Sequence, residues 1–256
     1  MNNFHSPQKK NTSWQKSGQW YNKLVGDKGH YYHQHVILPG VVRLLGLTDK
    51  SSLLDIGCGQ GVLARQLPKA VLYTGIDLAP GLIHSASLQD HAHGHSYLVA
   101  DVTKSLPLEK KDFTHATAVL SLQNMEHQEA AILHVGDHLV KNGRFVIVLN
   151  HPSFRIPRQS GWGISESKQQ YRYINRYLTP LKIPITMHPG EKQSPVTWSF
   201  HYPISLYTLF LHNAGFVIEI MEEWASDKES VGKASKMENR ARSEIPLFLT
   251  ISARKI

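Results

Sequence analysis

The sequence predicts an α/β fold in which a parallel β-sheet is covered by helices on both faces. The first observation is an alternation of short apolar runs, glycine turns and helical segments that continues from Ser51 to Asn150. The second is the return of a helix and strands after residue 203. Ligands of such sheets bind at the carboxyl ends of the strands, so residues that follow each strand are the first candidates for a site.

Residues 1–18 are polar and lack periodic apolar positions, so we expect a flexible tail. Residues 19–256 are expected to form a single domain. Its parts are a helical N-terminal cover at 19–50, a ligand-binding half at 51–150, an insertion at 151–203 and a C-terminal helix with strands at 204–256. The insertion is rich in prolines and aromatic residues and is too long for a plain connection, so we expect it to be a lid.

The periodicity predicts each element in turn. In the N-terminal segment, Val36, Val41, Leu44 and Leu45 have helical spacing. Strands are expected at 51–57, 71–77, 96–101, 112–122, 144–150, 216–224 and 245–255, and helices at 61–70, 80–89, 127–143 and 205–215. The helix at 127–143 is expected to end at Gly143, and residues 225–244 are expected to be a polar connection.

Composition excludes several classes of protein. The chain has 256 residues, of which 41% are hydrophobic and 19% charged, as in ordinary globular proteins. We expect no transmembrane segment and no signal peptide, because the apolar runs are short and the N-terminus is polar. The only cysteine, Cys58, cannot form an internal disulfide, so we expect a cytoplasmic protein. The net charge of +8 favours anionic partners, but it is scattered, so nucleic acid is possible and not favoured.

The stretch from Leu53 to Leu63, LLDIGCGQGVL, is a glycine-rich turn that follows a strand. A dinucleotide-binding turn has a third glycine where this chain has Val62. In addition, the carboxylate of Asp55 would repel a pyrophosphate and attract an ammonium group. The turn is therefore expected to hold a zwitterion rather than a phosphate chain.

Two more carboxylates follow strands. Asp77 comes 20 residues after Gly57 (77 − 57 = 20), where an acid can accept both hydroxyls of a ribose. Asp101 ends the third strand and is placed to meet an adenine amino group. Each of the three acids, Asp55, Asp77 and Asp101, could alone be explained by helix capping or turn chemistry. That alternative poorly explains why all three lie at matching strand ends.

With these residues the sequence resembles the class I S-adenosylmethionine-dependent methyltransferases, in particular the small-molecule, methyltransferase-11-like members. The resemblance implies a Rossmann-like, doubly wound sheet of seven strands with a reversed hairpin at one edge, and the lid insertion between strands 5 and 6. It implies S-adenosylmethionine as the cofactor. The residues expected to bind it are Asp55, Gly57, Cys58, Gly59, Gly61, Asp77, Leu78, Asp101, Val102, Ser121, Tyr21 and Tyr31.

Some of these assignments have a structural alternative. Cys58 is better explained as a small buried residue in a tight loop than as a nucleophile. Tyr21, Tyr31 and Tyr32 either close over the cofactor through cation–π contacts and hydroxyl hydrogen bonds or anchor the N-terminal segment to the core.

Methyl transfer needs alignment of the acceptor, exclusion of water and, for some acceptors, removal of a proton. The catalytic candidates are His151, after the fifth strand, and His127; His201 is a further possibility, and packing is the alternative for each. No metal is expected. The cluster of His84, His91, His93 and His95 lacks a closed ligand set and is expected to be solvated surface.

The loop after the fourth strand indicates the acceptor. It reads Ser121-Leu122-Gln123-Asn124 and lacks the Asn/Asp-Pro-Pro-Tyr that family members acting on adenine amines or glutamine amides carry. We expect a small organic acceptor that is aromatic, quinone-like or otherwise lipophilic. Methylation of RNA or protein, and cofactor binding without turnover, remain the alternatives.

Overall fold

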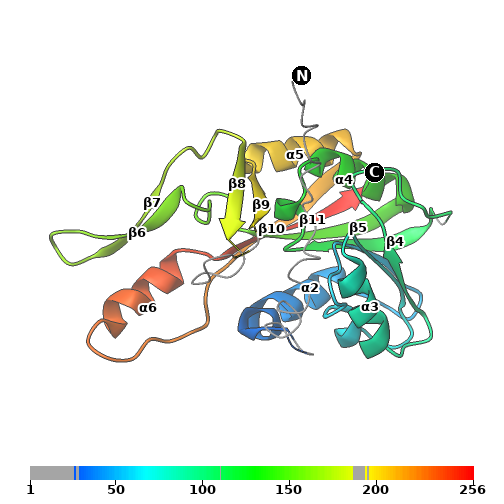
Figure 1. The fold of residues 1–256 in the computed structure, drawn as a ribbon, viewed down its shortest axis with the longest axis horizontal. Helices are drawn as coiled ribbons and strands as arrows, with labels where there is room; N and C mark the ends of the chain where they lie inside the picture. Colours follow the sequence, from blue (N-terminus) through cyan, green and yellow to red (C-terminus); the bar gives the residue numbers. More distant parts are fainter. Residues whose placement is uncertain (1–25, 27–28, 110, 187–193, 195) are drawn as a thin grey trace, which may run out of the picture.

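The computed structural model describes residues 26, 29–109, 111–186, 194 and 196–256. Its centre is a seven-stranded sheet in the order β10-β11-β5-β4-β1-β2-β3 (Figure 1). The strands are β1 (Ser52–Ile56), β2 (Leu72–Asp77), β3 (His95–Val99), β4 (Phe113–Val119), β5 (Leu139–Asn150), β10 (Phe216–Trp224) and β11 (Phe248–Lys255). Strands β1 to β5 pair in parallel, whereas β11 is antiparallel to both β5 and β10. The predicted Rossmann-like sheet with a reversed edge hairpin is confirmed.

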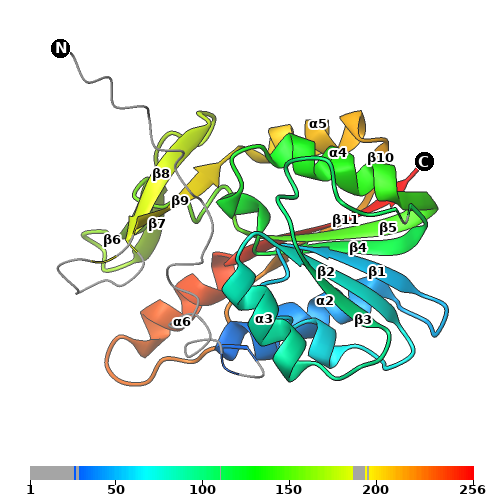
Figure 2. The same cartoon turned by 45° about the vertical axis from the view of Figure 1, so that its right-hand side comes forward.

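Helices cover both faces of this sheet (Figures 1 and 2). One face carries α4 (Gln128–His138) and α5 (Ile204–Asn213), and the other carries α2 (Leu38–Leu45) and α3 (Pro80–Gln89). The side chains of β1 alternate between two apolar clusters, since Leu54 and Ile56 belong to one and Leu53 to the other. All five residues of β1 are therefore buried, as expected for a central strand covered on both faces.

The N-terminal segment is helical, as its apolar spacing predicts. A π-helical turn, η2 (His33–Ile37), leads directly into α2, which ends at Leu45 and is capped by Gly46 with a left-handed φ of 59°. Ile37, Val41, Leu44 and Leu45 are buried in one apolar cluster with Leu53 and Val146. This packing fixes the segment against the sheet.

Three predicted elements were wrong. The helix expected at 61–70 is reduced to the 3₁₀ turn η3 (Ala64–Gln66), since Pro68 stops a helix that has barely begun. The helix expected at 127–143 ends at His138, and the following residues form the start of β5, in which Asn142 has a φ of 66°. The polar connection expected at 225–244 contains α6 (Ser235–Glu244), in which only Ala241 is buried.

The segment between β5 and α5 forms two antiparallel hairpins. One contains β6 (Ser160–Ile164) and β7 (Gln170–Ile174), and the other β8 (Leu181–Thr186) and β9 (Val196–His201). Both stand beside the main sheet rather than in it (Figures 1 and 2). α6 contacts the first hairpin, where the side chain of Arg240 donates a hydrogen bond to the carbonyl of Gln170. That the segment acts as a lid stays a prediction.

Among the described residues, no helix has the length and apolar character needed to cross a membrane.

Candidate cofactor and substrate site

The glycine-rich turn is held against the second strand. Gly57, Gly59 and Gly61 have φ values of 70°, 58° and 73°, a region that side chains disfavour. The amides of Gly57 and Cys58 both donate to the carbonyl of Ile76, at 2.7 and 3.0 Å. The turn therefore continues the contact between β1 and β2 past the end of β1.

Neighbouring side chains lie too close to Gly57 and Gly61 for any residue but glycine at these two positions. A Cβ on Gly57 would lie 2.4 Å from the Cβ of Ser121, and one on Gly61 would lie 2.6 Å from the Oη of Tyr97. Ser121 is buried, and its hydroxyl donates to the carbonyl of Ile56 at 2.7 Å. The end of β4 is thus fixed beside the glycine turn, and binding of the cofactor by Ser121 stays a prediction.

Asp77 connects the end of β2 to the glycine turn. Its Oδ2 accepts from the amide of Gly59 at 3.0 Å and its Oδ1 from the amide of Ala79 at 2.8 Å. Burial raises the pKa of Asp77, although these backbone hydrogen bonds oppose the rise. Each carboxylate oxygen keeps a second lone pair for further donors such as ribose hydroxyls. The adjoining Leu78 is 39% exposed and offers an apolar surface to a flat ring.

Asp101 lies at the same edge of the sheet. The amide of Ala100 donates to the carbonyl of Asp77, which joins the ends of β3 and β2. Burial acts to raise the pKa of Asp101, but hydrogen bonds from Thr103 and the nearby Lys104 outweigh it, so the pKa is lowered. The carboxylate is therefore ionised at neutral pH. Val102, next to it, is buried.

Asp55 is placed differently from the other two acids. It is 2% exposed, and its two oxygens accept hydrogen bonds from the hydroxyls of Tyr73 at 2.8 Å and Thr117 at 2.9 Å. Burial raises its pKa to about 6. Both neighbouring strands supply a partner, since Asp55 pairs with Thr117 of β4. A direct contact between Asp55 and an ammonium group stays a prediction.

Cys58 fills a space beside β2. A Cβ on Gly75 would lie 2.8 Å from the sulfur of Cys58. Burial, followed by the charges of Asp55 and Asp77, raises the pKa of the Cys58 thiol well above its usual value. The protonated thiol is a poor nucleophile, which agrees with the structural explanation.

His151 is buried directly after β5. Its Nε2 lies 2.6 Å from the Oε1 of Glu223, and its Nδ1 accepts from the amide of Ser153 at 3.2 Å. Burial lowers the pKa of His151, and the hydrogen bond with Glu223 opposes that change. Both ring nitrogens are engaged, so His151 takes a proton from a substrate only if one contact opens. The other candidate, His127, is exposed at the N-cap of α4.

The N-terminal tyrosines contact the segment after β10. The Tyr31 hydroxyl donates to Asp227 at 3.1 Å, and the ammonium of Lys228 lies 4.3 Å from the centre of the Tyr31 ring. The hydroxyl of Tyr32 lies 3.0 Å from the hydroxyl of Ser226. These contacts anchor the N-terminal segment to the residues after β10, as the structural alternative predicts. Binding of the cofactor by Tyr31 stays a prediction. Tyr21 lies outside the described residues.

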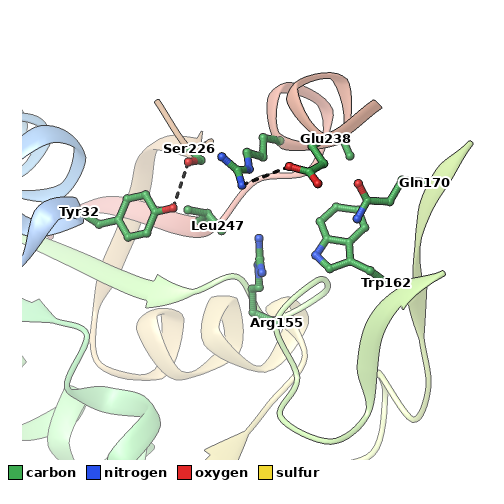
Figure 3. Close-up of a pocket in the computed structure, with 9 residues that line it drawn as sticks. Tyr32, Arg155, Trp162, Gln170, Ser226, Glu238 and Leu247 are labelled. Atoms are coloured by element: carbon green, nitrogen blue, oxygen red, sulfur yellow. Dashed lines mark hydrogen bonds and ion pairs between the residues drawn. The ribbon is translucent and has the colours of Figure 1, made fainter. Parts of the chain in front are cut away.

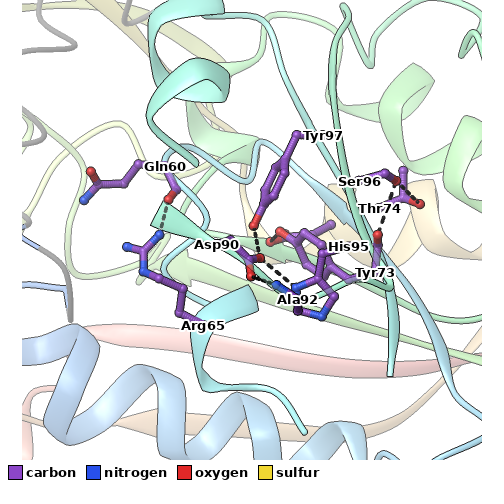
Figure 4. A network of polar contacts seen from close by, with 10 residues as sticks. Gln60, Arg65, Tyr73, Thr74, Asp90, Ala92, His95, Ser96 and Tyr97 are labelled. Atoms are coloured by element: carbon purple, nitrogen blue, oxygen red, sulfur yellow. Dashed lines mark hydrogen bonds and ion pairs between the residues drawn. The ribbon is translucent and has the colours of Figure 1, made fainter. Parts of the chain in front are cut away.

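Sequence reasoning missed a polar network behind the glycine turn (Figure 4). Asp90 accepts from the hydroxyl of Tyr97, and it lies 2.6 Å from the Nδ1 of His95. The side chain of His95 is 3% exposed, so the expectation that it is solvated was wrong. Burial against Asp90 and Tyr73 explains the difference. The described residues contain no cluster of metal-ligating side chains.

Leu120 was missed as well. It connects β4 to Ser121 with a φ of 51°, which is unusual for a branched side chain. Its amide donates to the carbonyl of Val148 at 2.8 Å, and its carbonyl accepts from the side chain of Asn124. Backbone strain of this kind concentrates at functional sites, but nothing in the sequence marks it.

A cavity of about 360 Å³ opens near the end of β5 (Figure 3). The amide of His151 donates to the carbonyl of Leu247 at 2.9 Å, and Leu247 lines the cavity. Because β11 begins opposite the end of β5, the cavity lies at the carboxyl edge of the sheet. Its lining residues are Tyr32, Arg155, Trp162, Gln170, Ser226, Glu238, Ala241, Arg242 and Leu247.

Comparison with known proteins agrees with this geometry. Residues 54–147 match the family model described as a methyltransferase domain. A crystal structure of an S-adenosylmethionine-dependent methyltransferase from Mesorhizobium loti is 26% identical, with a TM-score of 0.67, over 85% of this chain and 96% of the other. A putative one from Listeria monocytogenes is 23% identical, with a TM-score of 0.63, over 85% of this chain and 99% of the other.

A curated relative is the ubiquinone biosynthesis O-methyltransferase of Hydrogenovibrio crunogenus. It is 26% identical over 152 residues, which is 57% of this chain and 57% of the relative.

The strand order, the strand-end acids and these matches show that the chain has the fold of the class I S-adenosylmethionine-dependent methyltransferases. Within this class, its residues 54–147 belong to the methyltransferase domain family, and its cofactor is S-adenosylmethionine. The residues present fit that cofactor, because Asp77 at the end of β2 retains free lone pairs beside an exposed Leu78.

Proposed function

We propose that the protein transfers the methyl group of S-adenosylmethionine to a small organic acceptor that is aromatic, quinone-like or otherwise lipophilic. The observation that carries the proposal is the cavity of about 360 Å³ at the carboxyl edge of the sheet, the edge that also carries the glycine turn and Asp77. This volume suits one small molecule. The O-methyltransferase of ubiquinone biosynthesis from H. crunogenus supports an acceptor of quinone type.

The roles of individual residues follow from their positions. When bound, S-adenosylmethionine supplies an electrophilic methyl group. Asp77 would accept the ribose hydroxyls, Asp101 the adenine amine, and Leu78 would lie against the adenine face. The backbone of the glycine turn would hold the methionine end. The hairpins β6–β7 and β8–β9 would exclude water from the acceptor.

His151 would assist an acceptor that must lose a proton. In the structure its ring donates to Glu223 and accepts from the amide of Ser153, so the proposed role requires the Ser153 contact to open and free the Nδ1 atom. His127 is the exposed alternative. A cytoplasmic location stays a prediction.

A labelling experiment tests this function. The purified protein is incubated with methyl-labelled S-adenosylmethionine and a metabolite extract, and the labelled product is identified by mass spectrometry. We expect the label in a small molecule. Label in RNA or protein, with salt-dependent RNA binding, would instead support the macromolecular alternative, which the net charge of +8 favours. Tight cofactor binding with no labelled product from any extract would support binding without turnover.

A further inference from the structure

The cavity contains a half-buried guanidinium, that of Arg155, whose Nε lacks a hydrogen-bond partner among the described residues. Arg155 comes from the turn after β5, and its side chain points into the space between Tyr32, Trp162 and α6 (Figure 3). Among the described residues, the buried Nε of Arg155 has no hydrogen-bond partner, and none of them forms an ion pair with its guanidinium. Arg155 is half-buried, so its cation is only partly hydrated and the unpaired Nε points to an anion as its partner.

The neighbouring charged groups do not supply that anion. Arg172 donates to the carbonyl of Phe154 at 2.7 Å and to the hydroxyl of Ser160 at 2.8 Å, and it adds a like charge. Burial and the charge of Arg172 lower the pKa of Arg155 to about 10, so Arg155 is still cationic at neutral pH.

Glu238 is the only carboxylate that lines the cavity among the described residues, and it already faces a cation. Its Oε2 lies 3.9 Å from the Nη2 of Arg242, which also lines the cavity. The cavity therefore has a net positive charge, with two guanidinium groups and one carboxylate in its lining.

We propose that the methyl acceptor carries a carboxylate, which binds Arg155, on an aromatic or apolar body that lies against Trp162. This inference rests on the proposed function, since it places the acceptor of the methyl group in this cavity. One planar carboxylate matches one guanidinium through two parallel hydrogen bonds. A phosphate dianion would bring more negative charge toward Glu238 and is therefore less favoured.

The rest of the lining suits the body of such an acceptor. The indole of Trp162, with the guanidinium of Arg172 5.2 Å from its centre, is a flat apolar surface, and Ala241 and Leu247 add aliphatic surface. The Tyr32 hydroxyl, 3.0 Å from that of Ser226, provides a polar group on the opposite side (Figure 3).

The position of Arg155 would place the carboxylate of the acceptor near the end of β5 and the cofactor edge of the sheet. The amide of Arg155 donates to the carbonyl of His151 at 2.8 Å, so the cavity begins where β5 ends. The segment that carries Tyr32 also reaches the glycine turn, because the side chain of Gln60 donates to the carbonyl of Gly26 at 2.8 Å. An acceptor bound at Arg155 would thus lie at the cofactor edge.

Binding of simple probes tests the proposal without turnover. The full chain, saturated with S-adenosylhomocysteine, is titrated by calorimetry with benzoate, with benzyl alcohol as the neutral match and with phenyl phosphate. The variants are Arg155→Gln and Arg155→Lys. Arg158→Gln is the control, because Arg158 is an exposed arginine of the same loop that does not line the cavity. Thermal melts and cofactor affinity establish that each variant is folded.

We expect benzoate to bind the wild type more tightly than benzyl alcohol does, and Arg155→Gln to weaken benzoate about tenfold or more. Arg155→Lys should retain part of the affinity and Arg158→Gln all of it. Equal benzoate affinity in Arg155→Gln, or no benzoate binding by the wild type, overturns the proposal. Tighter binding of phenyl phosphate than benzoate overturns the choice of a carboxylate.

The labelling experiment separates the two proposals. A labelled product that is neutral, with a KM unchanged in Arg155→Gln, contradicts the carboxylate and leaves methyl transfer intact. Arg155-dependent benzoate binding without any labelled product contradicts the proposed function and leaves the anion site standing.

Discussion

The Nε2 of His151 lies 2.6 Å from the Oε1 of Glu223, and this contact joins the end of β5 to the end of β10. The His151 side chain is 1% exposed, whereas that of Glu223 is 56% exposed. A solvent-accessible carboxylate thus holds a buried imidazole whose backbone is bonded to Arg155 and Leu247, two residues that line the proposed acceptor cavity. Because the amide of Ser153 donates to Nδ1, the neutral ring carries its proton on Nε2 and donates it to Glu223.

The proton-accepting role of His151 predicts a change in the pH profile. His151→Gln should lower kcat about 100-fold or more, as expected for loss of a general base, and abolish the acidic limb of the profile. Burial places the pKa of His151 below 6.5, so the wild-type limb should lie below that pH. Glu223→Gln should move the limb to lower pH, because Glu223 raises the His151 pKa. Loss of stability with an unaltered profile would show that His151 only holds the loop.

Asp77 should dominate cofactor affinity. Asp77→Ala removes two acceptors from the amides of Gly59 and Ala79 as well as the proposed ribose contact. We expect the Kd for S-adenosylmethionine to rise about 100-fold or more, since hydrogen bonds to a charged group contribute about 1.5–3 kcal/mol each. Calorimetry measures the change, with Asp49→Ala, at an exposed position, as the control. An unchanged Kd would remove Asp77 from the cofactor site.

Gly61 and Tyr97 should be energetically coupled. Gly61→Ala places a side chain on a backbone with a φ of 73°, and this strain alone should destabilise the fold by about 1–2 kcal/mol. The new Cβ would also lie 2.6 Å from the Tyr97 hydroxyl, and this clash should add to the cost. In a Tyr97→Phe background, which lacks that hydroxyl, the cost should fall by about 1 kcal/mol. Urea denaturation of the four proteins measures the coupling. Equal costs in both backgrounds would mean that the turn adjusts independently of Tyr97.

His33 should make the stability depend on pH. Its side chain is 9% exposed, and burial, with a smaller contribution from His30, lowers its pKa to about 4. Between about pH 6.5 and 4 the unfolded chain binds one more proton at this residue, so stability falls as the pH falls, at up to about 1.4 kcal/mol per pH unit.

A matched variant isolates the His33 contribution. His33→Phe should lose less unfolding free energy than the wild type between about pH 6.5 and pH 5. Protonation of Asp55 stabilises the folded state as the pH falls, because the pKa of Asp55 is raised to about 6. This contribution is the same in both proteins and cancels in the difference between their unfolding free energies. Identical pH dependence of the two unfolding free energies, measured in urea, would contradict the assignment.

Elements with one clear periodicity could be predicted closely. The strand expected at 216–224 coincides with β10, and the helix expected at 80–89 coincides with α3, which starts at Pro80. The boundary between α4 and β5 was misplaced because Leu139 and Val140 suit either a helix or a strand. α6 was missed since a helix with a single buried residue, Ala241, shows no apolar stripe.

The site was predictable only where it depends on strand ends. Gly57 and Asp77 occupy the edge that the alternation of strands and turns indicated. The approach of Tyr97 to Gly61 and the unpaired Nε of Arg155 among the described residues depend on contacts between distant segments, which no local pattern encodes. The same holds for Asp55, whose two partners come from different strands.

The glycine turn is followed by the 3₁₀ turn η3 instead of an α-helix, and this has an electrostatic consequence. A helix that starts at such a turn aligns its peptide dipoles and presents free amides to a phosphate. Here the amides of Gly57, Cys58 and Gly61 are already bonded to backbone carbonyls. These three amides are therefore not available to a nucleotide phosphate. Competition from abundant cellular nucleotides such as ATP should be weak, so the cofactor would meet little interference at its own site.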